Sequence, residues 1–415
     1  MHIMITAIGS AGDINPMILI GSKLKQAGHR VDFICSPYFE EKVKRQNLNL
    51  LPLGTVDDYH EAICEPDAWK VEKAFPIVWR FVMKATEMNY ELIRKNKSEK
   101  TLLLGTTLAI GARLAQEAHN LPLATVHLSP ALMMSCYDTP QSTTSPMPEW
   151  TPKWIKSLWI KGFEKYMLDP VCMPPLNEYR AKLNLPPVSN VITKWIHSPD
   201  LVLCAFPPWF ARVQEDWPAN SVNTHFPLYK SNYDPPLLPE LEEFLLKGDP
   251  PLAFTAGTAM AFAKPTMIMG LKVAERLGKR CLLVCAFKSE LPSDLPDWAY
   301  HVPYANFQSL FKRVALAVHH GGIGTSAMAL ACACPQLISP FAHDQFDNAV
   351  RLELLGTARM VKGSDTVDKW ASAALEMLDP EVKKRCQIIA QQMENEISGE
   401  DAILELLTRK FMTKK

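Results

Sequence analysis

Short, uninterrupted apolar runs, each followed by a glycine-bearing turn and a helical segment, limit the folds open to this chain. The first run is Ile3–Ile8, and the loop Gly9–Pro16 follows it directly. Met17–Ala27 then has helical periodicity and closes at Gly28, and Val31–Cys35 is the next apolar run. Runs without alternation are typical of strands buried on both faces. A strand, a helix and a second strand in this order predict a parallel, doubly wound α/β sheet.

The same alternation continues in two series along the 415 residues. A polar, proline-rich stretch at 229–239 separates the two series and has the composition of a linker. We therefore expect one Rossmann-like domain over 1–230, a second over 231–393 and a final helix over 394–415. Ligands bind such sheets at the carboxyl ends of the strands, so a cleft between the two sheet edges is the expected site. The expected strands include 101–105, 123–129, 252–255, 281–285 and 316–319, and the expected helices include 110–118 and 266–277.

The charge balance and the composition exclude several classes of protein. The chain has 44 basic and 44 acidic side chains, and a net charge of zero offers no field that captures nucleic acid. With 47% hydrophobic and 21% charged residues, the composition is that of a globular protein. Ten scattered cysteines indicate buried apolar residues in a reducing compartment. No run approaches the roughly 18 apolar residues that span a bilayer, and no signal peptide is evident, so we expect a cytoplasmic protein.

A glycine-rich turn joins an expected strand to an expected helix at residues 319–326, which read His-His-Gly-Gly-Ile-Gly-Thr-Ser. Such a turn presents backbone N–H groups at a helix N-terminus, where they bind phosphate oxygens without a metal. The hydroxyls of Thr325 and Ser326 can add donors, and an adjacent histidine can donate to a diphosphate. The alternative is a plain glycine-rich turn that holds no ligand.

A second polar segment follows at residues 339–349. Asp344 and Gln345 place a carboxylate beside an amide, and such a pair can hold adjacent hydroxyls of a sugar. The alternative role of the pair is to cap a helix. The order and spacing of the two segments argue against the capping role.

Together the two segments resemble the family 1 glycosyltransferases, which use nucleotide-sugar donors and have the GT-B fold of two Rossmann-like domains facing across a cleft. The pattern is His-His-Gly-Gly-x-Gly-Thr, then Pro-Gln at 335–336 and Asp-Gln-x-x-Asn-Ala at 344–349. Residues 9–16, Gly-Ser-Ala-Gly-Asp-Ile-Asn-Pro, are similar to the acceptor loop of the bacterial and sterol-type members. The sequence further resembles the rhamnosyltransferases of rhamnolipid synthesis, which use a dTDP donor, at 7–13, 195–199, 214–218 and 342–348.

No Asp-x-Asp motif appears near an expected strand end, so we expect no catalytic metal, and the nucleotide sugar is a co-substrate and not a cofactor. The resemblance implies the residues of the donor site. His320 is expected to contact the diphosphate, with His319 as the second choice, and Tyr304 to lie near the nucleobase. Met328 stands where many UDP-sugar enzymes have a ribose-binding glutamate, and Asn306 replaces a common proline. Because a thioether accepts hydrogen bonds poorly, Met328 favours a dTDP donor over a UDP donor. The remaining expected donor-binding residues are Gly12, Thr258, Gly322, Gly324, Thr325, Asp344 and Gln345.

Asp13 is the expected general base. Transfer needs a group that takes the proton of the acceptor hydroxyl as the oxygen attacks the anomeric carbon. Asp13 follows the first expected strand, at the edge of the sheet that borders the expected cleft, where many relatives have a histidine. The alternative is that Asp13 caps a helix beginning near Pro16. His127, at another strand end, is expected to orient Asp13 or to line the acceptor pocket, with a purely structural role as its alternative.

Residues 150–167 form a basic amphipathic pattern. Trp154 with Leu158, and Ile155 with Trp159, recur at helical spacing, and lysines lie between them. One interpretation is a helix that lies on an anionic membrane and admits a lipid acceptor. The favoured interpretation is a helix whose apolar face covers the core of the N-terminal domain.

The predicted function is inverting transfer of a hexose or deoxyhexose from a UDP-glucose or dTDP-rhamnose type of donor to a hydroxyl of an apolar acceptor. The final helix is expected to pack back on the N-terminal domain, as in the family. Two alternatives stay open. One is a nucleotide-sugar epimerase or hydrolase with the same fold, and the other is a non-catalytic subunit that binds a nucleotide sugar and activates a partner. The presence of Asp13 argues against the second alternative, because such a subunit needs no base.

Overall fold

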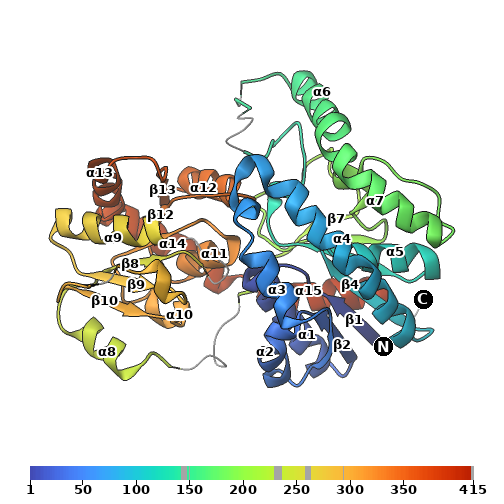
Figure 1. Cartoon of the computed structure of the whole chain (residues 1–415), viewed down its shortest axis with the longest axis horizontal. Coiled ribbons are helices and arrows are strands. Elements are labelled where there is room, and N and C mark those ends of the chain that lie inside the picture. The colour runs from blue at the N-terminus through green and yellow to red at the C-terminus, as the bar shows by residue number, and fades with distance from the viewer. Residues whose placement is uncertain (142–146, 149, 229–235, 258–262, 293, 413–415) are drawn as a thin grey trace. The chain divides into compact units, whose positions relative to one another are not determined.

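Two parallel β-sheets, each covered by helices, organise the computed structural model of the chain (Figure 1). The structure describes residues 1–412 except 142–146, 149, 229–235, 258–262 and 293. The chain divides into unit 1, Met1–Tyr229 with Ser398–Lys415, and unit 2, Lys230–Ile397. The predicted pair of doubly wound α/β domains is thereby confirmed.

The sheet of unit 1 has seven strands in the order β3-β2-β1-β4-β5-β6-β7, and every neighbouring pair is parallel. Its central strands are wholly buried, in agreement with the apolar residues that make up most of their sequences. The strands are β1 (His2–Thr6), β2 (Arg30–Cys35), β3 (Asn49–Pro52), β4 (Thr101–Thr106), β5 (Leu123–His127), β6 (Leu201–Cys204) and β7 (Ser221–Asn223).

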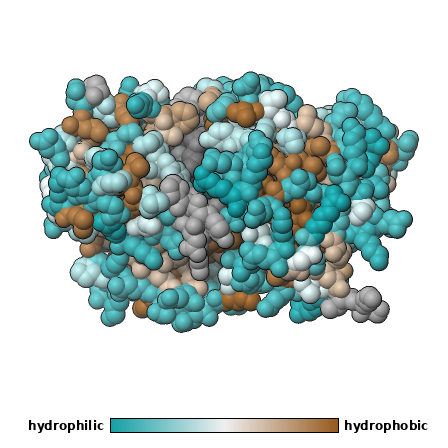
Figure 2. All heavy atoms as spheres, turned by 90° about the horizontal axis from the view of Figure 1, so that it is seen from below, coloured by the Kyte–Doolittle hydropathy of each residue, from teal (hydrophilic) through white to brown (hydrophobic). Residues whose placement is uncertain are grey.

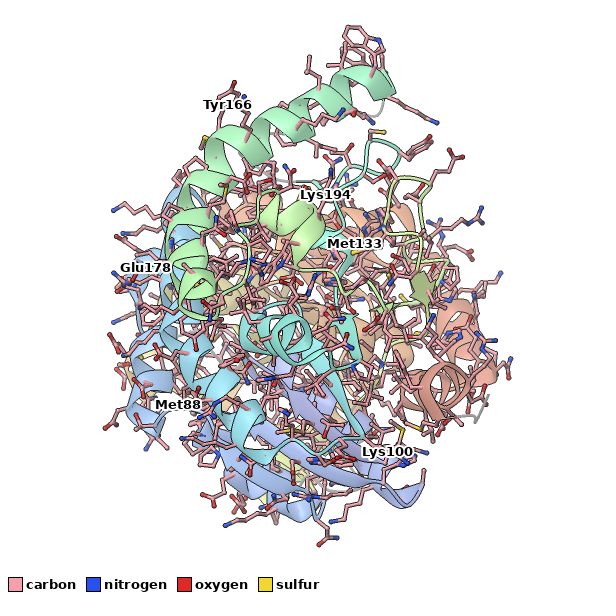
Figure 3. The ribbon with its side chains drawn as sticks, turned by 90° about the vertical axis from the view of Figure 1, so that its right-hand side faces the viewer. Met88, Lys100, Met133, Tyr166, Glu178 and Lys194 are labelled. Atoms are coloured by element: carbon pink, nitrogen blue, oxygen red, sulfur yellow. The ribbon has the colours of Figure 1, made fainter. Side chains whose placement is uncertain are left out.

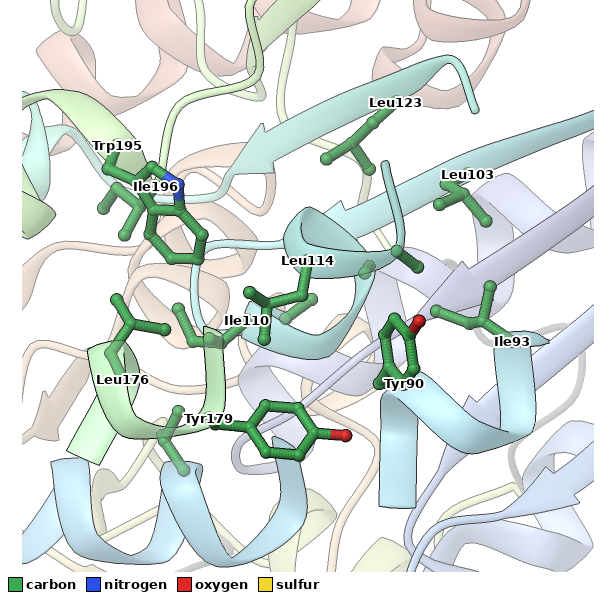
Figure 4. Packing of buried hydrophobic residues seen from close by; sticks show 14 of the residues in the cluster. Tyr90, Ile93, Leu103, Ile110, Leu114, Leu123, Leu176, Tyr179, Trp195 and Ile196 are labelled. Atoms are coloured by element: carbon green, nitrogen blue, oxygen red, sulfur yellow. The ribbon is translucent and has the colours of Figure 1, made fainter. Parts of the chain in front are cut away.

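The helices of unit 1 enclose this sheet. Figure 4 shows one of the packed layers, where Tyr90, Leu114, Tyr179 and Trp195 meet side chains of the strands. The helices are α1 (Ala11–Gln26), α2 (Glu40–Arg45), α3 (Val56–Ile63), α4 (Val71–Asn96), α5 (Ile110–His119), α6 (Lys153–Phe163), α7 (Asp169–Lys182) and α15 (Gly399–Leu407).

Helix α1 begins earlier than predicted. The expected loop 9–16 is mostly helical, because Ser10 and Asp13 form a capping box that starts the helix at Ala11. Pro16 therefore lies inside α1 and not before it. The proline lacks only the N–H that would bond the carbonyl of Gly12, and the helix continues through this single missing bond.

The sheet of unit 2 has six parallel strands in the order β10-β9-β8-β11-β12-β13. Its strands are β8 (Leu252–Thr255), β9 (Cys281–Val284), β10 (Ala299–Val302), β11 (Leu316–His319), β12 (Gln336–Ile338) and β13 (Ala358–Met360). Its helices are α8 (Pro239–Leu246), α9 (Lys264–Leu277), α10 (Phe307–Leu310), α11 (Ile323–Ala331), α12 (Gln345–Leu354), α13 (Val367–Met377) and α14 (Pro380–Asn395).

The end of the chain returns to unit 1. Where the sequence predicts one helix over 394–415, α14 ends at Asn395, and Ser398 caps the separate helix α15. Helix α15 packs against α1, and Lys23 and Asp401 form an ion pair of 2.9 Å between the two helices. Ile403 and Leu407 are fully buried in this contact.

One face of the molecule is mostly polar (Figure 2). On the face in Figure 2, hydrophilic residues predominate and hydrophobic residues gather in small patches. Among the described residues, every helix is too short or too polar to cross a bilayer.

Candidate active site

Each sheet has one point where the strand order reverses. In unit 1 the reversal lies between β1 and β4, and in unit 2 it lies between β8 and β11. The connections after such neighbouring strands leave in opposite directions, so a ligand crevice opens at the carboxyl ends of the two strands. Asp13 follows β1, Gly257 follows β8, and the glycine-rich turn follows β11. Asp13 and the glycine-rich turn thus lie at the reversal points, whereas Asp344 and Gln345 follow the neighbouring strand β12, Tyr304 follows β10, and His127 ends β5.

His319 holds the shape of the turn after β11. Its Nδ1 accepts a hydrogen bond of 3.1 Å from the N–H of Gly321, so its proton is on Nε2 and is donated to Gln336 Oε1 at 2.9 Å. Burial lowers the pKa of His319 to about 4. Both ring nitrogens are engaged within the fold, so the second-choice phosphate ligand has a structural role.

His320 lies in a slot between two glycines. A Cβ atom on Gly257 would come within 2.5 Å of the ring atom Cε1, and a Cβ on Gly322 within 2.5 Å of Nε2. Within the described part of the chain, the buried Nδ1 has no hydrogen-bond partner. Burial, and then the neighbouring His319 and His343, lower the pKa of His320 to about 3. The imidazole is therefore neutral near pH 7 and has hydrogen-bonding capacity left for a ligand.

The first turn of α11 completes the polar surface beside His320. Gly322 is the N-cap residue and provides no side-chain cap, so the first N–H groups of the helix lack an internal acceptor. Gly324 is exposed, and Thr325 is half-buried. The Ser326 hydroxyl is buried and has no partner among the described residues. This arrangement suits a phosphate group. Thr258, the remaining predicted phosphate contact, lies outside the described residues.

Asn348 ties the second polar segment to the turn. Its side-chain N–H₂ donates to the carbonyl of Gly321 at 3.0 Å and to Asp344 Oδ2 at 2.8 Å. Asp344 is the N-cap residue of α12, yet its carboxylate makes no capping bond, so the capping alternative does not describe its side chain. Sequence reasoning missed the bridge through Asn348, although this residue belongs to the motif that indicates the site.

Gln345 shapes the loop before α12. Its Oε1 accepts from the N–H groups of Phe341 and Ala342, at 2.7 and 3.1 Å. The loop includes His343 in the left-handed region, at φ 58°. The carbonyl end of Gln345 is thus committed to the backbone, and only its amide N–H₂ can serve as the predicted sugar contact.

The expected nucleobase loop contains Tyr304 and Asn306. Tyr304 is 40% exposed. Asn306 accepts from the N–H of Ser309 at 3.2 Å and so caps α10, which gives a structural reason for asparagine in place of proline. Met328 is buried within α11.

In unit 1, Asp13 is both a helix cap and a carboxylate at the sheet edge. Its Oδ2 accepts from the backbone N–H of Ser10 at 2.8 Å and from the Ser10 hydroxyl at 3.3 Å. Gly9 allows the close approach, because a Cβ there would lie 2.2 Å from Oδ2, and its φ is 134°. Asp13 therefore does cap α1, as the alternative interpretation predicts. The capping bonds hold its carboxylate in one place beside Gly12, in the first turn of α1.

An aromatic pair accompanies Asp13. Tyr38 follows β2 and Tyr59 lies in α3 after β3, and their rings stack at 4.4 Å. Burial raises the pKa of Tyr59, and the charges of Tyr38 and Asp13 raise it further. Tyr38 is 46% exposed and gives the pair an accessible aromatic surface. Sequence reasoning missed both residues, although each lies just after a strand of the same sheet edge.

His127 is buried in a hydrogen-bonded chain. Its Nδ1 shares a bond of 2.9 Å with the Thr107 hydroxyl, and its Nε2 shares one of 2.9 Å with His197. The side chain is 0% exposed, and burial holds its pKa well below the usual value. Any influence of His127 on an acceptor would pass through Thr107, the half-buried residue that follows β4.

Neither a metal centre nor a disulfide is evident in the described ranges. No group of three or more histidine, cysteine, aspartate or glutamate side chains is arranged there to hold a metal ion. All ten cysteines are free, and eight of them are buried.

Comparisons with known proteins agree with this geometry. Residues 3–135 match the glycosyltransferase family 28 N-terminal domain. Glycosyltransferase GtfE of Amycolatopsis orientalis is 26% identical over 94% of this chain and 93% of its own length. The O-mycaminosyltylonolide 6-deoxyallosyltransferase of Streptomyces fradiae is 26% identical over 97% and 96%. A sterol 3-beta-glucosyltransferase of Arabidopsis thaliana is 24% identical over 95% of this chain and 66% of its own length.

Solved structures show the same fold over the whole chain. The kitacinnamycin glycotransferase superimposes with a TM-score of 0.74 at 15% identity and covers 99% of both chains. VinC, solved in complex with dTDP, superimposes with a TM-score of 0.68 at 18% identity and covers 98% of both. The resemblance predicted from the motifs is confirmed, and the chain is a glycosyltransferase with the GT-B fold, whose residues 3–135 match the family 28 N-terminal domain.

Proposed function

We propose that the enzyme transfers a hexose or deoxyhexose from a nucleotide-diphosphate sugar to a hydroxyl of an apolar acceptor, with inversion at the anomeric carbon. The observation that carries the proposal is the slot of His320. It combines a neutral imidazole, two flanking glycines and an open helix N-terminus at one reversal point of the sheet. These are the groups that stabilise a departing diphosphate.

The leaving group would be held without a metal. His320 would donate one hydrogen bond to a diphosphate oxygen, and the first N–H groups of α11 would donate others. The helix dipole adds partial positive charge at the same place. Gly322 and Gly324 let the oxygens approach the backbone, and Thr325 and Thr258 are assigned as hydroxyl donors.

Asp13 would act as the base of the transfer. The acceptor oxygen forms a bond to the anomeric carbon while the bond from this carbon to the diphosphate oxygen breaks. The hydroxyl proton moves to the Asp13 carboxylate and then to solvent. The hydrogen bonds from Ser10 keep the carboxylate oriented for this task.

The donor sugar would lie against the start of α12. Asp344 would accept from a sugar hydroxyl, and the amide of Gln345 would donate to its neighbour. Asn348 holds Asp344 next to the phosphate turn, so a single unit supplies contacts to both parts of the donor.

A dTDP sugar is the proposed donor. Met328, in place of a ribose-binding glutamate, offers no strong acceptor for a 2′-hydroxyl, which dTDP lacks. VinC has been solved with dTDP, and a relative is named as a 6-deoxyallosyltransferase. An apolar acceptor agrees with the relatives named for a sterol and for O-mycaminosyltylonolide, and with the accessible ring of Tyr38. The ten free cysteines support the predicted cytoplasmic location.

The sequence alternative of a non-catalytic subunit is set aside, because the relatives over nearly the whole chain are named glycosyltransferases. Asp13 alone does not exclude that alternative, since capping α1 is sufficient reason for an aspartate at this position. A turnover assay tests the proposed transfer directly, because the enzyme releases a glycosylated acceptor.

Calorimetry with UDP and dTDP tests the donor site. We expect His320→Ala to weaken binding of the preferred nucleotide by about tenfold or more, the loss of one hydrogen bond to a charged group. The matched control is His119→Ala in unit 1, because His119 is also half-buried with an unpartnered ring nitrogen. Equal affinities for wild type and His320→Ala would refute the assignment of the diphosphate site.

A further inference from the structure

Helix α6 and the residues around it expose an unusual number of large apolar side chains. Trp150 is 83% exposed, Trp154 69%, Leu158 65% and Tyr166 70%. Figure 3 shows the segment, with Tyr166 on the outside of the molecule. Single exposed apolar residues are ordinary, but a group of them in one segment marks an interaction surface.

The exposed residues of α6 form one stripe. Trp154, Leu158 and Lys161 are spaced by four and three positions, which places them in line along α6, and Lys165 lies in the π-helical turn Glu164–Leu168 that continues the helix. We call this stripe, with Trp150 and Tyr166, the outer face of α6. It begins with bulky apolar side chains and continues with ammonium groups.

The inner side of α6 has a different composition. Trp159 and Phe163 are half-buried and stack at 5.1 Å, and Lys156 is buried. The favoured sequence interpretation, in which the apolar face covers the core, is therefore wrong for Trp154 and Leu158. Helical periodicity identified two faces, and the buried side is the one that contains Trp159 and Lys156.

The outer face is positively charged. Lys161 and Lys165 of this face are exposed. Lys153 is also exposed but is not part of this face, and its ammonium lies 3.7 Å from the ring centroid of Tyr137. The carboxylates in the described residues of 150–169 are Glu164 and Asp169, and both are buried. Glu164 accepts from the backbone N–H of Ile192 at 3.0 Å, and Asp169 accepts from the N–H of Val191 at 3.1 Å. Neither carboxylate is available to neutralise the lysines at the surface.

We propose that the outer face of α6 docks on the surface of an anionic lipid bilayer. Tryptophan and tyrosine rings favour the headgroup region, where one part of the ring is apolar and another is wet. Lysine stems lie along apolar surface while their ammonium groups reach lipid phosphates. The exposed lysines thus complement an anionic surface.

A second copy of the chain is a poorer partner for the outer face of α6 than an anionic bilayer. A symmetric contact would bring the same positive stripe of both copies together, and like charges would repel. The proposal depends on this helix alone and not on the donor or acceptor assigned above.

Co-sedimentation with vesicles tests the proposal. Wild type is mixed with vesicles of phosphatidylcholine alone, or of phosphatidylcholine with phosphatidylglycerol. We expect binding to the anionic vesicles, and a loss of about tenfold or more in the partition coefficient of the double variant Trp154→Ser, Leu158→Ser. Lys161→Gln with Lys165→Gln should abolish the preference for the anionic lipid.

The matched control is Leu246→Ser with Ile388→Ser, which removes two exposed apolar residues from unit 2 and should bind as wild type does. Circular dichroism and nucleotide calorimetry verify that each variant is folded. Wild-type binding by Trp154→Ser, Leu158→Ser would overturn the proposal. A dimeric wild type and a monomeric double variant in light scattering, with no vesicle binding by either protein, would also overturn the proposal.

Discussion

At the scale of single residues, the two adjacent histidines of unit 2 divide two tasks. His319 uses both nitrogens to hold the turn, and His320 keeps a nitrogen available at the reversal point of the sheet. The surroundings of the two histidines could not be predicted from the sequence. Which of them contacts Gln336 depends on how β11 pairs with β12. The choice of His320 rests on the motif and stays a prediction about function.

Gly257→Ala tests the slot of His320. A Cβ at this position meets the imidazole at 2.5 Å, so the ring has to move, and we expect nucleotide binding to weaken by about tenfold. Gly278→Ala is the control, because Gly278 also has a positive φ but a Cβ there meets nothing within 4 Å. In both variants, backbone strain lowers the free energy of unfolding by about 1 kcal/mol. Similar nucleotide affinities of the two variants, measured by calorimetry, would show that the ring position is unimportant.

Asp13→Asn separates catalysis from capping. Asparagine still accepts the bonds from Ser10 but cannot act as a base, so we expect turnover to fall by about 10²–10⁴-fold with unchanged nucleotide affinity. The matched control is Asp58→Asn, because Asp58 has the same place in the capping box of α3 as Asp13 has in that of α1. Steady-state kinetics and calorimetry measure both quantities. Full activity of Asp13→Asn would exclude Asp13 as the base.

At the scale of elements, strands were easier to predict than helix ends. Strands β8 and β11 have the predicted bounds, because a glycine-bearing turn follows each apolar run within two residues. The predicted start of α1 is wrong because a proline such as Pro16 is typical of a first helical turn, while the box formed by Ser10 and Asp13 begins six residues earlier. A capping box is readable from sequence, so this miss was avoidable.

The aromatic pair beside Asp13 was not predictable in the same way. Tyr38, Tyr59 and Asp13 come to the same sheet edge only because the strand order β3-β2-β1 brings three separate connections there. The orientation of α6 was also beyond the sequence pattern, since a periodic pattern shows two faces but not which one is covered.

Helix α15 depends on a close backbone contact. A Cβ on Gly399 would lie 2.2 Å from the carbonyl oxygen of His225, so the helix would have to shift. We expect Gly399→Ala to lower the free energy of unfolding of unit 1 by about 1–3 kcal/mol. Urea unfolding measures the change, with Gly363→Ala as the control, because a Cβ at Gly363 meets nothing within 4 Å. Equal losses for both variants would mean that the α15 contact adds nothing to stability.

At the scale of the whole molecule, buried histidines make the fold sensitive to acid. Burial lowers the pKa of His197 and His319 to about 4, that of His320 to about 3, and that of His127 well below its usual value. In the unfolded chain each titrates near pH 6.5. Below that pH the unfolded chain binds protons that the native state does not, so stability falls as the pH falls.

The expected loss is about 1.4 kcal/mol per pH unit for each such histidine, between about pH 6.5 and pH 4. Urea unfolding at several pH values in this window measures it. His197→Gln should reduce the slope, whereas His60→Gln, at an exposed position, should leave it unchanged. Stability that stays constant over the window would contradict the assignment of these histidines as neutral and buried.

The return of α15 to unit 1 has a consequence for biosynthesis. A ribosome completes residues 230–397, which are unit 2, before it makes the helix that packs on α1. Unit 2 therefore has all of its own residues available for folding while unit 1, although begun first, still lacks a piece of its surface. Until Ile403 and Leu407 emerge, the side of α1 that they bury faces solvent. The nascent enzyme is thus finished in reverse order, and a ribosome that stalls after residue 397 leaves an apolar strip on α1 for chaperones to recognise.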